Sequence, residues 1–457
     1  MENDESLPET AREIFLGALA DCSIERAFAE QVTIGRSLLI NGTEAVQLED
    51  IERIRIIAAG KASATMLAAV LPRFQAAGFH DLGGILIAPE APAELPAGFR
   101  FFAGGHPLPD KASCDGARAA LDMLHTLPRG GQGAPSTLCL FLISGGASAM
   151  MELPLDDSIS LPDLICFYRE LVHCGASIAE INCVRKHFSA VKGGRLAMAA
   201  AGLLTLSFLV SDVPPQHLDA LGSGPTLPDT STVEECRNVL SRYSLLQRFP
   251  ASVRNFFEKQ NLPETPKPNQ LSAKAVTLLS SEDLADAARQ RAETLGFHVV
   301  IDSTCDDWNY KEAAEYLVGR LRELRKEFRR VCLISPGEVT VEVAGSGAAG
   351  IGGRNQHFAL YAATLLRKDE GKSVILSAGS DGIDGNSCVA GAAIDRHTLQ
   401  RAKAAGLNVK ESLRQFDSGN FLERVGSVIA TGPTGNNLRD LRILLADASI
   451  DMTAGTM

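Results

Sequence analysis

The chain has 457 residues, of which 45% are hydrophobic and 22% charged, so it is long enough for two or three globular domains. Its net charge of -11 argues against nucleic-acid binding, and any anionic ligand must be held by a local basic site. No apolar run approaches the roughly 20 residues of a membrane span. Ten cysteines without a C-x-x-C pair indicate reduced thiols, and residues 1–22 predict an amphipathic helix, not a secretory signal. We therefore expect a soluble cytoplasmic protein with neither nucleic-acid nor membrane partners.

The first half of the chain alternates between apolar strands and amphipathic helices. The predicted strands are 51–58, 83–88, 99–102, 138–143 and 204–210. The predicted helices are 64–75, 111–127, 162–174 and a long run over 178–201. This alternation predicts βαβ units on a parallel sheet, which is a Rossmann-like three-layer α/β fold.

A proline-rich polar segment at 263–269 is typical of a linker and divides the chain. We expect an N-terminal domain over 1–265 and a smaller C-terminal α/β domain over 270–457. The second domain restarts with a strand at 275–280, and the short link to an expected strand at 339–343 indicates a mixed sheet. Its other predicted elements are helices 281–296, 310–328 and 355–366 and strands 298–302, 331–335 and 373–378.

Four polar loops each follow a predicted strand, and the carboxyl ends of parallel strands meet at one edge of a sheet. The loops are 59–63, 144–148, 211–214 and 379–385. Together they supply a lysine, aspartates and glycines, which suits phosphoryl transfer: a cation and N–H groups for phosphate, carboxylates for a metal or a base.

The loop 144–148 joins the central strand to a predicted helix N-terminus, which favours a phosphate or carboxylate. Its candidate binding residues are Ser144, Gly145, Gly146 and Ser148, although a tight turn without a ligand gives the same pattern. Lys61 stands where the helix dipole favours acids, so a functional role is preferred to a surface one. Asp212 is either a turn residue or a metal ligand or base.

Two basic features and a pair of glycines stand out in this acidic protein. Arg185, Lys186, Lys192 and Arg195 form a basic run that is either a solvated helix face or a ligand site. Gly193 and Gly194 fall inside the predicted helix, where glycine is costly, so a packing or ligand reason is expected. Arg354 follows the glycine-dense loop 345–353 and is a candidate guanidinium clamp for phosphate or carboxylate.

Other motifs leave one alternative open. Residues 345–350 match G-x-G-x-x-G, so an NAD(P)H-dependent reductase must be considered, although the helix and acidic residue of a dinucleotide fingerprint are misplaced. No G-x-x-x-x-G-K-[ST] motif occurs. His106 and His217 lie in polar loops and are possible acid/base groups, but loop histidines are more often surface residues.

Eight ordered segments that span nearly the whole chain resemble the second class of glycerate kinases, the glycerate 2-kinase family with a C-terminal MOFRL-type domain. The segments are AAGKAS (58–63), GGHPLPD (104–110), LISGGASAMMELP (142–154), INCVRKHFSAVKGGRLA (181–197), LVSDVPPQHLDALGSGPTLPD (209–229), GSGAAGIGGRNQHFAL (345–360), SAGSDGIDG (377–385) and TGPTGNNLRDL (431–441). Some members were once labelled hydroxypyruvate reductases.

The resemblance implies an ATP- and Mg²⁺-dependent kinase that phosphorylates D-glycerate at its 2-hydroxyl, with the active site in a cleft between the two domains. It implies catalytic roles for Lys61, Arg354 and Asp212. We expect Asp212 to act as a base or a metal ligand, with Asp381 as a second candidate metal ligand. Lys186 and Glu338 join residues 144–148 as expected substrate or phosphate contacts. The oligomeric state is left open between monomer and homodimer, and a non-catalytic sugar-acid-binding protein is a further alternative.

The chain departs from the family pattern near the expected site. The family's S-D-V-P-G-D has Pro215 and Gln216 in place of its last two residues, and R-N-Q-E has His357. G-G-E-T and D-G-x-D-G-P-T are replaced by 336–339 (PGEV) and 381–387 (DGIDGNS). These changes flank Lys61, Asp212 and Arg354 without removing them, so kinase chemistry is still expected.

Overall fold

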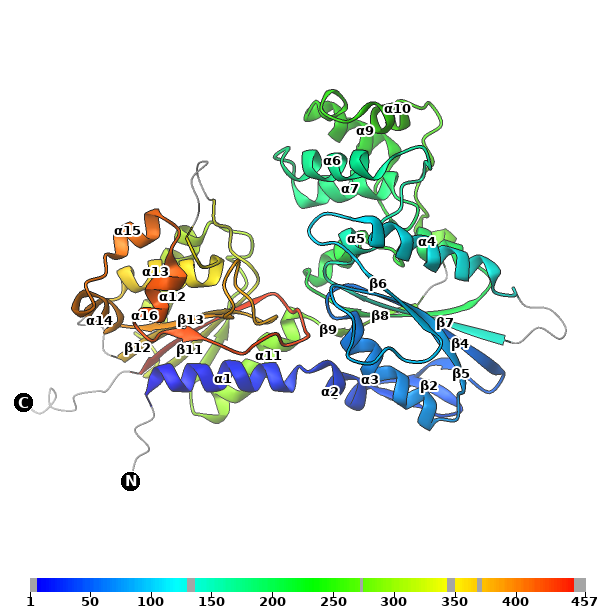
Figure 1. Ribbon diagram of the computed structural model, residues 1–457. Helices are drawn as coiled ribbons and strands as arrows, with labels where there is room; N and C mark the ends of the chain where they lie inside the picture. The colour runs from blue at the N-terminus through cyan, green and yellow to red at the C-terminus, as the bar shows by residue number, and fades with distance from the viewer. Residues whose placement is uncertain (1–5, 130–135, 272–273, 343–349, 368–371, 448–457) are drawn as a thin grey trace, which may run out of the picture. The chain divides into compact units, whose positions relative to one another are not determined.

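The computed structural model describes residues 6–129, 136–271, 274–342, 350–367 and 372–447 (Figure 1). They form two compact units that differ from the expected division at 265–270. One unit comprises 24–279, and the other combines residues up to 23 with residues from 280 onward. Among the described residues no helix is both long and apolar enough to cross a membrane.

The unit 24–279 is built on a six-stranded parallel sheet, which confirms the predicted class of fold. Its strand order is β6-β5-β4-β7-β8-β9, and every neighbouring pair is parallel. The strands are β4 (Ile51–Ala59), β5 (Asp81–Ala88), β6 (Phe99–Ala103), β7 (Ser136–Ser144), β8 (Leu204–Val210) and β9 (Lys274–Leu279). Since the chain winds outward from β4 in one direction and from β7 in the other, the order reverses between these two strands. Ligands of open parallel sheets bind at such a reversal, at the carboxyl ends of the strands.

Helices cover both faces of this sheet, as the buried strands require. In Figure 1, α4 (Lys111–Thr126) lies on one side and α2 (Ile24–Gln31) and α3 (Ser63–Ala76) lie on the other. A small antiparallel sheet, which was not predicted, follows α2. Its strands are β1 (Val32–Ile34), β2 (Ser37–Ile40) and β3 (Thr43–Gln47).

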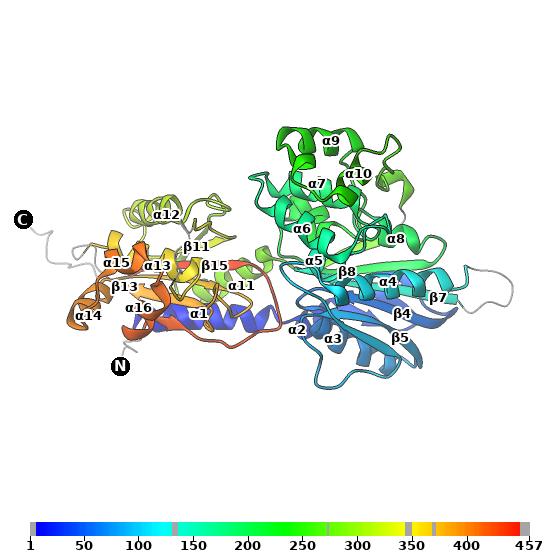
Figure 2. The ribbon, with the colours of Figure 1, turned by 45° about the horizontal axis from the view of Figure 1, so that its top comes forward.

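A helical part of the same unit, seen in Figure 2, has its own core, which is rich in aromatic side chains. It contains α6 (Leu161–Val172), α7 (Ile178–Phe188), α9 (Val233–Arg242) and α10 (Ala251–Phe257), and short elements α5 (Ala147–Met150), α8 (Arg195–Ala199), η1 (Pro215–Ser223) and η2 (Leu245–Gln247) flank it. Phe167 stacks on Phe188 with ring centroids 4.1 Å apart, and Phe249, Phe256 and Phe257 surround this pair. The predicted continuous helix 178–201 is wrong: Gly193 and Gly194 adopt φ of 56° and 82° in a turn between α7 and α8.

The second unit has a mixed six-stranded sheet, as predicted, in the order β10-β11-β15-β12-β13-β14. Only β10 and β11 are parallel neighbours. The strands are β10 (His298–Ile301), β11 (Arg330–Pro336), β12 (Lys372–Gly379), β13 (Gly391–Asp395), β14 (Val428–Ile429) and β15 (Asp440–Asp447). The helices of this unit are α1 (Leu7–Asp21), α11 (Ser281–Thr294), α12 (Tyr310–Leu324), α13 (Arg354–Leu365), α14 (Thr398–Ala404), α15 (Val409–Arg414) and α16 (Ser418–Arg424). The short turn η3 (Pro268–Gln270) belongs to the first unit, where it precedes β9.

Three expectations about this part of the chain need correction. The segment 275–280 does not open the second sheet, because β9 pairs with β8 as the edge of the first sheet. Residues 339–342 form no strand, and only a single bridge joins Thr340 to Asn309. The N-terminal helix α1 belongs to the second unit, where it packs on α11 and β12. Its buried face of Ile14, Phe15 and Ala18 supplies the apolar contact.

Candidate active site

Two loops meet where the order of the parallel sheet reverses. The loop after β4 carries Lys61, and the loop after β7 is 144–148. Gly60 has a φ of 120°, and a Cβ there would lie 2.4 Å from the Ser144 Oγ, so only glycine allows this approach. The Lys61 N–H donates to the Gly145 carbonyl (2.8 Å), and the Ala62 N–H donates to the Ser144 hydroxyl (3.0 Å). The fold therefore brings the predicted lysine and the predicted glycine turn together.

A third loop, 104–110, joins this site through Gly146. That glycine has a φ of 83°, and a Cβ on it would lie 3.1 Å from Lys61 Cγ and 3.4 Å from His106 Cδ2. The side chains of Lys61 and His106 are exposed at this edge. Both are thus available to a ligand, and His106 lies at the site although its place in a polar loop did not single it out.

The predicted serines brace the loops with their hydroxyl groups. Ser144 is fully buried, and the Ser148 hydroxyl hydrogen-bonds that of Ser223 (2.8 Å), which donates in turn to Asn182 Oδ1 (3.0 Å). The Tyr168 hydroxyl hydrogen-bonds the Ser148 carbonyl (3.1 Å). The helix after the turn, α5, is one turn of four residues. The backbone of the glycine turn, rather than the serine side chains, therefore remains the predicted contact for an anion.

A buried ion pair lies behind this loop and was not predicted. Glu152 and Lys192 are buried, and Lys192 Nζ lies 2.5 Å from Glu152 Oε2. The Tyr168 hydroxyl also hydrogen-bonds Glu152. Burial and the Glu152 carboxylate raise the pKa of Tyr168, so this hydroxyl stays protonated and can donate. The pair fixes the segment that follows α5 against the helical part.

Asp212 and Lys186 have different surroundings. Asp212 lies two residues after the end of β8, whose last residue pairs with Ser144, and Asp212 is half-buried. Lys186 is buried, and its ammonium pairs with Asp219 (2.7 Å) and with buried Asp229 (3.0 Å). Because two carboxylates already balance its charge, Lys186 holds α7 to the loop 219–229, and its predicted contact with substrate stays a prediction.

The second unit gathers its own charged cluster around Arg354, the first residue of α13. Its guanidinium donates to both carboxylate oxygens of Asp440 (2.6 and 3.1 Å) and to Glu338 (2.6 Å). Burial alone would lower the pKa of Arg354, but the two carboxylates outweigh it and raise the pKa above its usual range. Arg354 is therefore a fixed cation whose planar fork is held in one orientation.

Asp381 lies in this same cluster. A Cβ on Gly379 would be 3.3 Å from carboxylate oxygens of both Asp381 and Asp440. Asp381 also accepts the Ile383 N–H (3.1 Å), which is the turn role open to such an aspartate. Arg439 and Asp306 make a bidentate pair alongside, with both distances 2.6 Å, and Asp306 accepts the Glu338 N–H (3.0 Å).

The N-terminus of α13 is occupied by a buried carboxylate. Asp384 accepts the N–H groups of Asn355 (3.0 Å) and Gln356 (2.8 Å). Burial, together with the charge of Asp440, raises the pKa of Asp384 to about 6 in spite of these hydrogen bonds. The helix end is therefore filled by the protein itself.

We expect this shift to make stability depend on pH. Because the pKa of Asp384 rises from 3.8 to about 6 on folding, the folded state holds the proton more tightly, and this stabilisation is lost as pH rises through about 6. Asp384→Asn, which stays neutral, should gain stability relative to the wild type between pH 4 and pH 7. Urea unfolding at several pH values, followed by Trp308 fluorescence, measures the difference. A difference that does not change with pH would contradict the shift.

Gln216 and His357, two of the residues that depart from the family pattern, lie in different surroundings. Gln216 is exposed at the start of η1. His357 is buried, with its ring centroid 4.6 Å from that of Tyr310 and 5.1 Å from that of Phe416. Burial and the charge of Lys311 lower the pKa of His357 to about 4, so it is neutral. The side chain at 357 thus packs among aromatic rings and does not contact the Arg354 cluster through any hydrogen bond found in the described residues.

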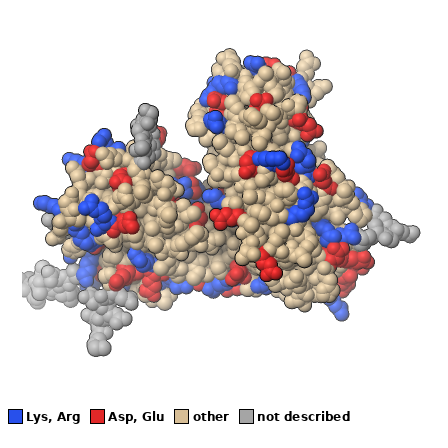
Figure 3. All heavy atoms as spheres, viewed as in Figure 1, with Lys and Arg blue, Asp and Glu red and all other residues tan. Residues whose placement is uncertain are grey.

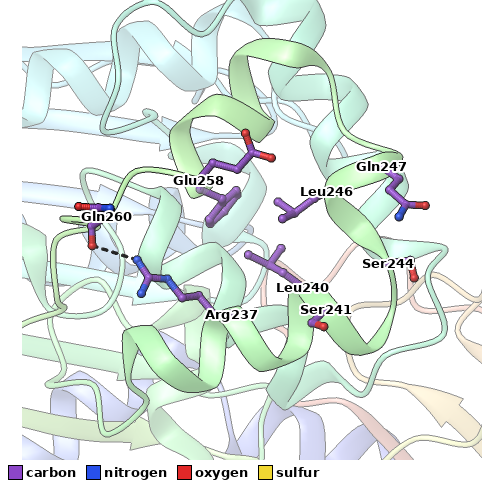
Figure 4. A pocket seen from close by; sticks show the side chains of 9 residues that line it. Arg237, Leu240, Ser241, Ser244, Leu246, Gln247, Glu258 and Gln260 are labelled. Atoms are coloured by element: carbon purple, nitrogen blue, oxygen red, sulfur yellow. Dashed lines mark hydrogen bonds between the residues drawn. The ribbon is translucent and has the colours of Figure 1, made fainter.

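A cavity of about 600 Å³ lies in the helical part, away from the sheet edge (Figure 4). Leu240, Leu246 and Phe257 line it, and the Arg237 guanidinium at its edge donates to the Lys259 and Gln260 carbonyls (3.1 and 3.0 Å). None of the predicted site residues lines this cavity. Its lining mixes these apolar side chains with polar ones such as Ser241 and Glu258.

Within the ranges that the structure describes, no group of three or more His, Cys, Asp or Glu is arranged to hold a metal ion. Mg²⁺ commonly needs only one or two carboxylates when substrate phosphates supply the other ligands.

Figure 3 shows acidic and basic side chains interspersed on the face it displays, so a local basic site, not a broad positive surface, must attract an anion.

The predicted site residues fall into two groups, one in each unit. Lys61, Asp212, Lys186 and the loop 144–148 belong to 24–279, whereas Arg354, Glu338 and Asp381 belong to the second unit. The G-x-G-x-x-G motif at 345–350 lies almost wholly outside the described residues. Sequence reasoning missed Asp440, Asp384, Glu152 and Tyr168. The sequence did contain a signal for Asp440. It is an acidic residue at the start of the apolar strand β15, and it lies in the segment 431–441 that resembles the family.

Comparison with known proteins adds the family. Residues 10–258 match the model described as "Domain of unknown function (DUF4147)", and residues 331–440 match the MOFRL family. These matches define a two-domain α/β protein, and the chain belongs to the glycerate kinase family that combines these domains. Some members carry another name: a protein of Agrobacterium vitis, 32% identical over 86% of this chain and 87% of its own, is called a putative hydroxypyruvate reductase.

Two matches concern Thermotoga maritima. Its D-glycerate 2-kinase is 33% identical over 449 residues, which cover 97% of this chain and 99% of that protein. A crystal structure of glycerate kinase from the same organism superposes with a TM-score of 0.80 at 32% identity, over 96% of this chain and 99% of that one. The similarity therefore spans both units.

Proposed function

We propose that the protein is a glycerate 2-kinase, which transfers the γ-phosphoryl group of ATP to the 2-hydroxyl of D-glycerate and releases ADP and 2-phosphoglycerate. The observation that carries this proposal is the meeting of Lys61 with the glycine turn 144–148 where the strand order reverses. A cation beside a glycine turn at that position suits a phosphate group. The similarity to D-glycerate 2-kinase over nearly the full chain supports the substrate.

We assign three roles in the transfer. The hydroxyl oxygen of glycerate attacks the γ-phosphorus, a new P–O bond forms, and the bond to the β–γ bridging oxygen breaks as ADP leaves. Lys61 and Arg354 would balance the charge of the transferring group and of the substrate carboxylate, and Asp212 would accept the hydroxyl proton or hold the metal. Positioning and electrostatic stabilisation carry most of the catalysis in this class.

Mg²⁺ is proposed as the accompanying ion. The half-buried carboxylate of Asp212 at the end of β8, and Asp381 beside Asp440 in the other unit, are oxygen donors of the kind Mg²⁺ takes. The bound ion would supply positive charge to the phosphates of ATP. Glu338 and Asp440, in contrast, are engaged with Arg354 and orient it.

The fork of Arg354 gives a specific expectation. Arg354→Lys keeps the charge but cannot donate in parallel to Asp440, so we expect kcat to fall by about 10²-fold while the protein stays folded. Steady-state ADP release measures this. Arg320→Lys, at a half-buried position of α12 that pairs with Glu323, is the matched control and should keep full activity. Equal activities of the two variants would remove Arg354 from the reaction.

The proposed function is tested by incubating the purified protein with D-glycerate, ATP and Mg²⁺, with ADP release followed by a coupled assay and the product identified by ³¹P NMR. Formation of ADP with 2-phosphoglycerate is expected. Oxidation of NADH with hydroxypyruvate, without ADP formation, would establish the reductase instead. Binding of glycerate without turnover in either assay would indicate a non-catalytic sugar-acid-binding protein.

A further inference from the structure

The loop 104–110 that carries His106 is held firmly against the site. The Gly104 N–H donates to the Ala88 carbonyl at the end of β5 (3.2 Å), and the Gly105 N–H donates to the Ser113 hydroxyl (2.9 Å). A Cβ on Gly104 would lie 2.6 Å from the Met150 carbonyl, so the loop packs on α5. His106 is therefore presented by a backbone anchored to both β5 and α5.

The imidazole lies beside Lys61 across Gly146, as the two distances of 3.4 and 3.1 Å from the Cβ position of Gly146 show. Partial burial and the positive charge of Lys61 lower the pKa of His106 to about 4, so the ring is neutral near pH 7 and can accept a proton. A phosphate bound at Lys61 would offset that charge. His106 would therefore become a stronger base when the nucleotide is bound.

We propose that His106 is a further catalytic residue, the group that takes the proton from the acceptor hydroxyl during phosphoryl transfer. As the hydroxyl oxygen bonds to the γ-phosphorus, its proton passes to a ring nitrogen of His106 and later to water, while ADP leaves with the electron pair of the broken P–O bond. This assignment rests on the proposed kinase function. Asp212, which follows β8, the strand next to β7, would then hold the metal and not accept the proton.

The proposal predicts a chemical rescue. His106→Ala should lower kcat by about 10²-fold, since positioned acid–base groups typically contribute 10² to 10⁴. Added imidazole should restore activity in a saturable manner, and the KM for ATP should stay within twofold of the wild-type value. His80→Gln is the matched control, because His80 is exposed just before β5, at the opposite edge of the sheet, and should keep full activity.

The outcomes separate this proposal from the proposed function. If the wild type phosphorylates glycerate and His106→Ala retains at least a third of its kcat, the assignment is wrong. A large loss without any response to imidazole, or with a matching rise in the KM for ATP, would also overturn it, because His106 would then only shape the loop. If the wild type makes no ADP with glycerate, the kinase function itself fails.

Discussion

Replacement of Lys61 by alanine is expected to lower kcat by about 10²-fold or more. The side chain is exposed at the sheet edge, while the contacts that hold its loop come from backbone N–H groups of residues 61 and 62. The variant should therefore fold normally and lose charge stabilisation of the transferring group. Steady-state rates with saturating D-glycerate and ATP, together with the melting temperature, measure the two effects separately.

Lys111→Ala is the matched control for this experiment. Lys111 is also exposed and begins α4, where it pairs with Asp115, and its removal should leave kcat unchanged. A folded Lys61→Ala protein with wild-type kcat would exclude Lys61 from catalysis. A Lys61→Ala protein that fails to fold would instead give the lysine a structural role that its backbone contacts do not suggest.

Replacement of Glu152 by glutamine is expected to cost about 3–5 kcal/mol of stability, because it leaves the buried Lys192 ammonium without its carboxylate. The unit 24–279 should then unfold at lower urea concentration by far-UV circular dichroism. The single tryptophan, Trp308, lies in the other unit, so its native fluorescence spectrum should not change and reports that this unit is intact.

A double variant separates charge from packing at this pair. Glu152→Gln combined with Lys192→Met removes both charges while keeping similar volumes, and it should recover much of the lost stability. If the double variant is as unstable as the sum of the two single variants, the pair makes no specific contribution. In that case the hydrogen bonds of Tyr168 would carry the effect.

The parallel sheet was predictable because its strands are short apolar runs between helices. The segments 51–58 and 138–143 can be buried on both faces only in a covered sheet, and they became β4 and β7. The helix over 178–201 was wrong because propensity alone cannot show that Gly193 and Gly194 turn the chain between α7 and α8, directly after the ion-paired Lys192. The assignment of the strand 275–280 to the second sheet failed for a similar reason. A strand's partner is set by packing and not by its place in the chain.

The candidate site was predictable where function lies in a loop directly after a strand. Lys61, Asp212 and the turn 144–148 were singled out by that placement, and the structure brings Lys61 and the turn together. Pairing between distant segments was not visible: Asp440 and Arg354 are 86 positions apart, and Glu152 and Lys192 are 40 apart. His106 was set aside because a loop histidine has no special pattern, and only the contact with Gly146 places it beside Lys61.

The place of α1 has a consequence for how the protein is made. As the chain leaves the ribosome, this helix emerges before its partners α11 and β12, which follow more than 250 residues later, after a whole unit has been synthesised. During that time the apolar face of α1, which includes Phe15, has no partner surface and is exposed. A fragment that starts at residue 280 would lack the helix altogether, and it would leave the matching surface of its sheet open to association with other chains.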